Sequence, residues 1–107
     1  MPDKISASHI LIMHKDSDNS RSKLSKSEAK KKIDEILIDL KKDEKKFADF
    51  AINNSDCASS EYAGDLGEFG HGVMVKEFEE AAFKLEIGEI SEVVETAFGF
   101  HVIKRNK

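Results

Sequence analysis

The sequence predicts an α+β fold, in which a small antiparallel sheet of about four strands is surrounded by about four helices. Two observations carry this prediction. Apolar and β-branched residues run together near both ends of the chain, in "ISASHILIM" and "GFHVIKR", as is typical of strands. Between these ends, apolar residues recur at helical spacing in several segments. The order of strand, helices and strands favours an antiparallel sheet flanked by helices.

The first strand is expected over Ile5 to Met13, which places His9 in its middle. The polar segment that follows, residues 14–25, has no periodicity and is predicted to be a loop. A loop of about a dozen residues is long for a compact domain, which is typical of a functional or mobile segment.

Helices are predicted in three places. Ser25 and Glu28 form an S-x-x-E capping box, which starts a helix over residues 26–42. A shorter helix is expected around residues 45–54, and another over residues 76–85. The apolar residues expected on the inner faces are Ile33, Ile36, Leu37 and Leu40, then Phe47, Phe50 and Ala51, then Phe78, Ala81, Ala82 and Leu85.

The remaining strands are expected near the C-terminus and in the middle of the chain. Residues 91–96 and 99–105 read as two strands joined by a tight turn. A short strand near residues 66–69 would complete the sheet. With no internal repeat and no long Gly/Ser linker, we expect a single domain over residues 1–107.

Composition narrows the function classes. Lys and Arg number 17 against 21 Asp and Glu, and the net charge of −4 argues against a nucleic-acid partner. A single cysteine, Cys57, favours a reducing compartment. The N-terminus lacks the layout of a signal peptide, and no apolar run approaches the length of a transmembrane segment. We therefore expect a cytoplasmic protein, and a monomer.

Four of the six glycines fall between Gly64 and Gly72, in "GDLGEFGHG". This stretch lacks the G-x-x-x-x-G-K-[ST] pattern of a phosphate loop and follows no βαβ pattern, so a nucleotide site is not expected. Some of these glycines are expected to form turns. Turns alone do not explain the large apolar residues just beyond them, Met74 and Phe78.

His9 and His101 both lie in apolar strands. If these strands are neighbours, the two rings meet on one sheet face, with Phe98 or Phe100 nearby. The alternative is two separate core histidines, each bonded to a backbone group. A metal site is not expected, because zinc requires three or four ligands and only one cysteine is present.

Cys57 is open to two interpretations. A thiolate beside an imidazole would make a nucleophile, but no local protease signature surrounds this residue. The alternative is a small, half-buried residue that lines a site or the core. Lys15, Arg21 and Lys23 lie in the long polar loop and offer contacts to an anion, or else a solvated loop surface.

In chain order, S-H-I-L-I, S-D-C, G-D-L-G-x-F, M-x-x-x-F-E and G-x-H-V-I-K-R resemble the parvulin family of peptidyl-prolyl cis/trans isomerases. The resemblance covers nearly the whole chain. It implies that His9, Cys57, Thr96 and His101 form the catalytic network, without covalent attack by Cys57. It also implies that the proline pocket is formed by Leu66, Met74 and Phe78, with Phe98 at its rim. No cofactor and no metal are implied.

The function expected from this resemblance is rotation of X-Pro peptide bonds in proline-containing peptides and in unfolded or flexible protein segments. A peptide-binding chaperone module with incidental isomerase activity is the alternative. The S-D-C motif and the long loop are similar to the subgroup directed at phosphoserine or phosphothreonine before proline. However, Met13 stands where that subgroup has a lysine, and no arginine pair is present. We therefore expect at most a modest preference for an acidic residue before proline.

Overall fold

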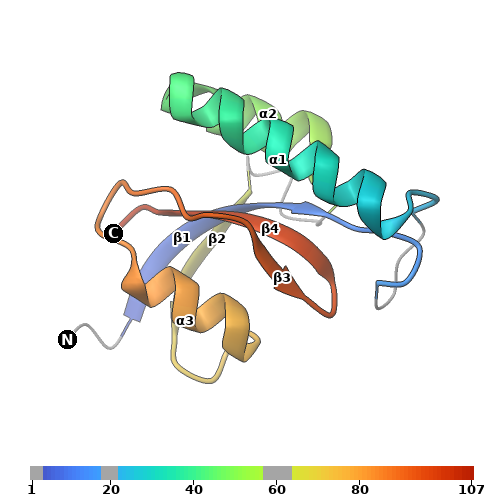
Figure 1. The fold of residues 1–107 in the computed structure, drawn as a ribbon. Coiled ribbons are helices and arrows are strands. Elements are labelled where there is room, and N and C mark those ends of the chain that lie inside the picture. Colours follow the sequence, from blue (N-terminus) through green and yellow to red (C-terminus); the bar gives the residue numbers. More distant parts are fainter. Residues whose placement is uncertain (1–3, 18–21, 57–63) are drawn as a thin grey trace.

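The strands from the two ends of the chain lie side by side at the centre of one sheet. In the computed structural model, which describes residues 4–17, 22–56 and 64–107, β1 (Lys4–Ile12) pairs antiparallel with β4 (Gly99–Arg105). The outer strands are β2 (Asp65–Gly70), which pairs with β1, and β3 (Val94–Thr96), which pairs with β4. The order is β2-β1-β4-β3 and all pairs are antiparallel, which confirms the predicted four-stranded sheet (Figure 1).

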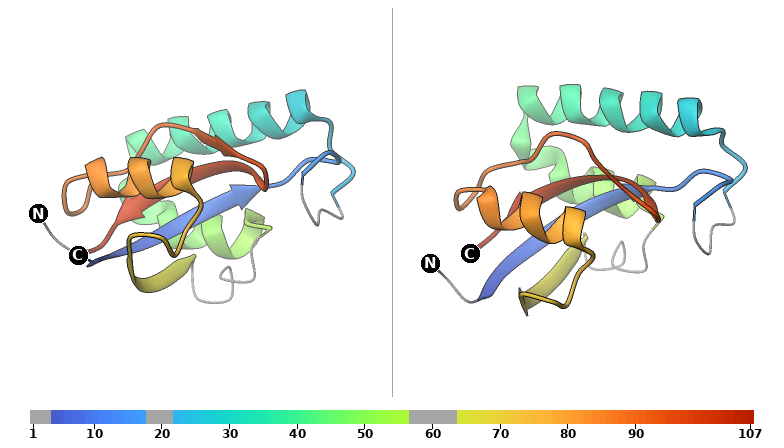
Figure 2. Two further views of the ribbon diagram at one scale, coloured as in Figure 1. Left: turned by 90° about the horizontal axis from the view of Figure 1, so that it is seen from below. Right: turned by 60° about the horizontal axis from the view of Figure 1, so that its bottom comes forward.

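Helices cover both faces of this sheet. α1 (Lys26–Lys42) and α2 (Phe47–Asn54) lie on one face, and α3 (Lys76–Lys84) lies on the other, as the two further views make clear (Figure 2). A single 3₁₀ turn, Glu44–Lys46, leads into α2. The described chain thus has three α-helices and one 3₁₀ turn where about four helices were expected. No helix in the described ranges is both long and apolar enough to span a membrane.

Side-chain alternation along β1 and β4 divides the core in two. Successive residues of a strand point to opposite faces, so Ile10 and Val102 pack with the buried residues of α1 and α2. Ile5 and Ile103 pack on the other face with Phe78 of α3. Each face of the sheet therefore has its own apolar cluster, and the α3 face is the one that carries the site described below.

The start of α1 follows from its capping box. The Ser25 hydroxyl accepts the Glu28 N–H at 3.1 Å, and the Glu28 carboxylate accepts the Ser25 N–H at 2.9 Å. These bonds satisfy backbone donors that a helix leaves free at its first turn. The helix has the predicted bounds, and its predicted inner residues Ile33, Ile36, Leu37 and Leu40 are buried.

The strand predicted over residues 91–96 is shorter than expected. Only Val94–Thr96 form β3, while Ile90 makes an isolated bridge to Lys104. The cause is Ser91, whose hydroxyl accepts the Ile103 N–H at 2.9 Å and so takes the place of a backbone partner. The chain leaves the sheet after Ser91 and rejoins it at Val94.

Gly64 lets the chain pass close to His9. It has φ +83° and its carbonyl accepts the His9 N–H at 2.9 Å. A Cβ at this position would overlap the His9 carbonyl oxygen. Glycine is therefore required at position 64, because the backbone there lies too close to β1 at His9 for a side chain to fit.

Candidate active site

The two strand histidines meet on the sheet face that α3 covers. Leu11 of β1 lies opposite His101 of β4, and His9 lies opposite Ile103, so the two histidines are diagonal neighbours. His9 Nδ1 lies 3.1 Å from His101 Nδ1, and the rings stack with their centroids 5.3 Å apart. The structure therefore shows a histidine pair and not two separate core histidines.

Thr96 extends the pair into a chain of hydrogen bonds. Its hydroxyl oxygen lies 2.7 Å from His101 Nε2 and accepts the Phe98 N–H at 3.1 Å. Because one Nδ1 must donate and the other must accept, the neutral pair has two tautomeric arrangements, and the Thr96 hydroxyl complements His101 Nε2 in each, by donating to it or by accepting from it. In either arrangement His9 Nε2 is buried and has no hydrogen-bond partner among the described residues.

Both imidazoles are held neutral at physiological pH. His9 is 5% exposed and His101 is 4% exposed. Burial lowers the pKa of His9 to about 4. Burial, and secondarily the charge that His9 would carry, lower the pKa of His101 to about 3. A histidine with such a pKa is not in its imidazolium form at neutral pH, so neither ring is suited to act as a general acid.

Phe78 of α3 closes the site from the other side. Its ring meets His9 edge-on, with centroids 5.4 Å apart, and meets His101 in the same way at 5.4 Å. Such edge-to-face contacts are favourable between aromatic rings. Phe78 therefore holds the planes of both imidazoles in place.

An apolar cavity of about 500 Å³ opens beside the pair. It is lined by His9 and His101 and by all four residues expected at the proline pocket, namely Leu66, Met74, Phe78 and Phe98. Five further lining residues were missed by the sequence reasoning, namely Leu11, Met13, Asp56, Val73 and Val75. Leu11 follows His9 by two positions on the same strand, so strand alternation predicts that both side chains lie on the same face.

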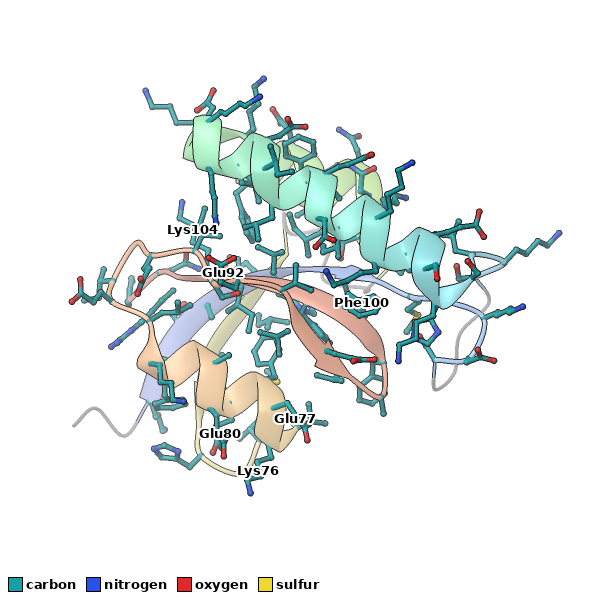
Figure 3. The ribbon with its side chains drawn as sticks, viewed as in Figure 1. Lys76, Glu77, Glu80, Glu92, Phe100 and Lys104 are labelled. Carbon is teal, nitrogen blue, oxygen red and sulfur yellow. The ribbon has the colours of Figure 1, made fainter. Side chains whose placement is uncertain are left out.

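Phe100 does not belong to this cavity. Its side chain packs in the cluster under α1, and its ring lies 5.8 Å from that of His14. Figure 3 labels it on the α1 side of the sheet, opposite the α3 residues Lys76, Glu77 and Glu80. Of the two phenylalanines considered as neighbours of the histidines, only Phe98 lines the site. Phe100 points to the other face because it has the opposite parity to His101 on β4, whereas Phe98 precedes the strand.

The remaining candidates lie outside the cavity or outside the described residues. Lys15 and Lys23 are exposed, and neither lines the cavity, whereas Met13 does. Cys57 and Arg21 lie outside the described ranges. Among the described lining residues, Asp56 is the only carboxylate, and it accepts the Met13 N–H at 2.8 Å.

His71, which stands between two glycines in the turn before α3, has two partners. Its side chain is 61% exposed, but its ring stacks on Phe83 with centroids 4.2 Å apart. Its Nδ1 lies 3.4 Å from a carboxylate oxygen of Glu79. Both partners, Glu79 and Phe83, lie in α3, and no local sequence pattern around His71 predicts these contacts.

Among the described residues, this geometry offers an apolar wall and a neutral, hydrogen-bonded histidine pair with no charged group between the two rings. Such a site suits the binding of an apolar ring and of a polarised amide.

Comparison with known proteins agrees with these features. The model of the family described as PPIC-type PPIASE domain matches residues 1–107. The peptidyl-prolyl cis-trans isomerase Pin1 of Digitalis lanata is 42% identical over 113 residues, which cover 96% of each protein. The foldase protein PrsA of Staphylococcus aureus is 43% identical over 106 residues, which cover 98% of this chain and 33% of PrsA. The solved structure of peptidyl-prolyl isomerase ESS1 from Candida albicans superposes with a TM-score of 0.95 at 32% identity, over 98% of this chain and 63% of that one.

Proposed function

The chain belongs to the PPIC-type peptidyl-prolyl cis-trans isomerase family, the parvulins, and we propose that the cavity beside His9 and His101 is where it rotates X-Pro peptide bonds. The observation that carries this proposal is the neutral histidine pair on the wall of an apolar cavity. Its substrates are proline-containing peptides.

The chemistry needs no bond to break. Rotation about a peptide bond meets a barrier of about 18–20 kcal/mol, because the twisted amide has lost its resonance. An X-Pro bond exchanges in tens to hundreds of seconds without help. Catalysis therefore requires only that the site binds the twisted amide better than either planar isomer.

We assign the proline ring to Leu66, Met74 and Phe78, with Phe98 at the rim. A cavity of this volume lies within the usual range for ligand pockets of about 300–1,000 Å³ and has room for residues beside proline. Apolar walls grip the ring, and the exclusion of water strengthens the polar interactions at its edge.

We assign to His9, His101 and Thr96 the role of an orienting network. Their hydrogen bonds fix the ring planes against which the amide turns, and the low pKa values of the histidines argue against acid and base roles. Cys57 is proposed as a further member of this network, without nucleophilic attack.

Substitution of Met74 tests the assignment of the cavity. Met74→Ala removes much of one wall, and we expect kcat/KM for a short Ala-Pro peptide to fall at least tenfold, mainly through KM. Ile87→Ala is the matched control, because Ile87 is 70% exposed and lies outside the cavity. Equal activity of the two variants in a protease-coupled isomerisation assay would overturn the assignment.

A second candidate function is a peptide-binding chaperone module in which turnover is incidental. The observation that favours it is an apolar rim, since Val73 is 66% exposed and Val75 is exposed beside it. A relative named as a foldase, PrsA, is consistent with it. If this function dominates, His9→Leu loses isomerase activity but still protects a client from aggregation, while Met74→Ala loses the protection.

We further propose that residues 1–107 act as one domain and as a monomer, on unfolded or flexible segments, in the cytoplasm. The single cysteine supports a reducing compartment, and the net charge of −4 supports peptide partners over nucleic acid. Light scattering of the purified chain tests the monomer. Preference for phosphorylated substrates is proposed to be modest, because Met13 lines the cavity and Lys15 and Lys23 do not.

A further inference from the structure

The turn between β2 and α3 carries three wall residues of the cavity. Val73, Met74 and Val75 all line it, and they follow a glycine, Gly72, with φ +85°. Of the three, Val73 is 66% exposed and Met74 is partly buried. Glycine gives a turn conformational freedom, so something must hold this turn if Met74 is to keep one position.

Glu79 of α3 contacts this turn at two successive residues. One carboxylate oxygen accepts the Gly72 N–H, and the other lies 3.4 Å from His71 Nδ1. Its own backbone N–H donates to the Val75 carbonyl at 2.9 Å. Glu79 therefore joins both ends of the segment that contains Met74 to the same helical turn.

The His71 ring adds an apolar contact to this arrangement. It stacks on Phe83, and Phe83 meets Phe69 edge-on with centroids 6.1 Å apart. Phe69 lies 6.1 Å from Phe78, the residue that meets both site histidines. The turn is thus packed onto the same row of aromatic rings that ends at the histidine pair.

The ionisation of Glu79 agrees with this role. The Gly72 N–H, and to a smaller extent His71, hold the pKa of the Glu79 carboxyl below its usual value. The carboxylate form is the one that accepts both contacts.

We propose that Glu79 is a positioning residue for substrate binding, which fixes the 71–75 turn through Gly72 and His71 and so holds Met74 against the proline ring. The proposal rests on the assignment of Met74 to the proline site. Because it concerns the wall and not the amide, its loss weakens binding of the ground state and the transition state alike, which raises KM and leaves kcat nearly unchanged.

Three variants separate the contribution of the Glu79–Gly72 hydrogen bond from that of the Glu79–His71 contact. Glu79→Ala removes both side-chain contacts, and we expect KM for an Ala-Pro peptide to rise three- to tenfold with kcat within twofold of the parent. Glu79→Gln keeps an oxygen acceptor for the Gly72 N–H, so KM is expected to stay within twofold. His71→Ala removes the ring and its bond to Glu79 but not the Gly72 bond, and its KM is expected to lie between those of the other two.

Glu77→Ala is the matched control. Glu77 is also a carboxylate in the first turn of α3, is exposed and lies outside the cavity, so its removal changes the charge at the helix start without touching the turn (Figure 3). We expect its KM and kcat to equal those of the parent. A rise in KM shared by Glu77→Ala and Glu79→Ala would assign the effect to charge alone and overturn the proposal.

A second measurement reports directly on the environment of Met74 in the cavity wall. Methyl-¹³C methionine labelling reports on Met74 and Met13 separately, and these two residues line the same cavity from different segments of the chain. Glu79→Ala is expected to shift or broaden the Met74 methyl signal and to leave that of Met13 in place. If Met74→Ala raises KM but Glu79→Ala changes neither KM nor the Met74 signal, the positioning role is wrong and the proline site stands. If Met74→Ala has no effect on KM, the site assignment itself fails.

Discussion

His9 and His101, 92 positions apart in sequence, face each other through the same ring atom, with Nδ1 to Nδ1 at 3.1 Å. This hydrogen bond requires a proton on one Nδ1 and a lone pair on the other. A proton on the second Nδ1 as well would make two N–H donors face each other and would place a positive charge inside an apolar site. The pair is therefore stable only while both rings are neutral, and this gives the fold a dependence on pH.

We predict that the free energy of unfolding falls as the pH decreases from about 6.5, the ordinary pKa of histidine, towards the folded pKa values of about 4 for His9 and about 3 for His101. In that range the unfolded chain binds more protons than the folded chain, so lowering the pH favours unfolding. The slope is at most about 1.4 kcal/mol per pH unit for each histidine. Urea unfolding at pH 7, 6 and 5 measures it.

His101→Phe provides the comparison for this slope. With one of the two depressed histidines removed, unfolding takes up about one proton fewer, so the loss of stability between pH 6.5 and pH 5 is expected to be clearly shallower. A parent protein whose unfolding free energy is flat over this range would contradict the neutral pair.

Thr96 is predicted to act through His101. Thr96→Val keeps the shape of the side chain but removes the partner of His101 Nε2 and the acceptor for the Phe98 N–H. Leaving such buried groups unpaired costs about 1–3 kcal/mol of stability. We expect kcat/KM to fall at least fivefold, because the His101 ring loses its fixed orientation, and we expect Thr96→Ser to restore most of it. Equal loss in the Ser and Val variants would assign the effect to packing.

How far the sequence predicted this site depends on the kind of contact. Strand alternation and helix capping act within a few residues, so His9 in a strand and the start of α1 at Ser25 were predictable. The pairing of β1 with β4 is a contact between the two ends of the chain, and the register that sets Leu11 opposite His101 comes from tertiary packing. The full cavity lining therefore required the structure.

The positions of the Phe98 and His71 side chains could not be predicted from sequence periodicity either. Alternation on β4 begins at Gly99, so Phe98 lies in the turn, where period-two reasoning gives no side-chain direction. His71 stands between two glycines and looks solvent-exposed in sequence, yet Glu79 and Phe83 bind it from α3. Contacts of a turn with a later helix leave no periodic signal in either segment.

Gly64, just before β2, and Gly67, within β2, are predicted to differ in their tolerance of alanine. Gly64 and Gly67 both have positive φ, +83° and +71°. A Cβ at Gly67 meets nothing within 4 Å, whereas a Cβ at Gly64 overlaps the His9 carbonyl. Gly67→Ala is expected to cost about 1–2 kcal/mol for the left-handed conformation alone. Gly64→Ala should cost more and also lower kcat/KM, because it displaces the strand that carries His9. Urea unfolding of both variants tests this, and equal costs would refute the close approach.

The residue before proline is predicted to influence turnover only weakly through charge. Of the described residues that line the cavity, none is a lysine or arginine, Met13 and Leu11 are apolar, and Asp56 adds a carboxylate to the same wall. Comparison of kcat/KM for pSer-Pro, Glu-Pro and Ala-Pro peptides at several salt concentrations measures this preference.

A contact from Lys15 or Lys23 in the exposed loop, screened by solvent, would give a small preference for an acidic residue before proline, and this preference would decrease as the salt concentration rises. A preference of about a hundredfold for pSer-Pro, equivalent to about 2.7 kcal/mol, would require a built anion site and would contradict the prediction. Lys15→Ala and Lys23→Ala then identify its source, since a loss of that preference in either variant places the phosphate at the loop.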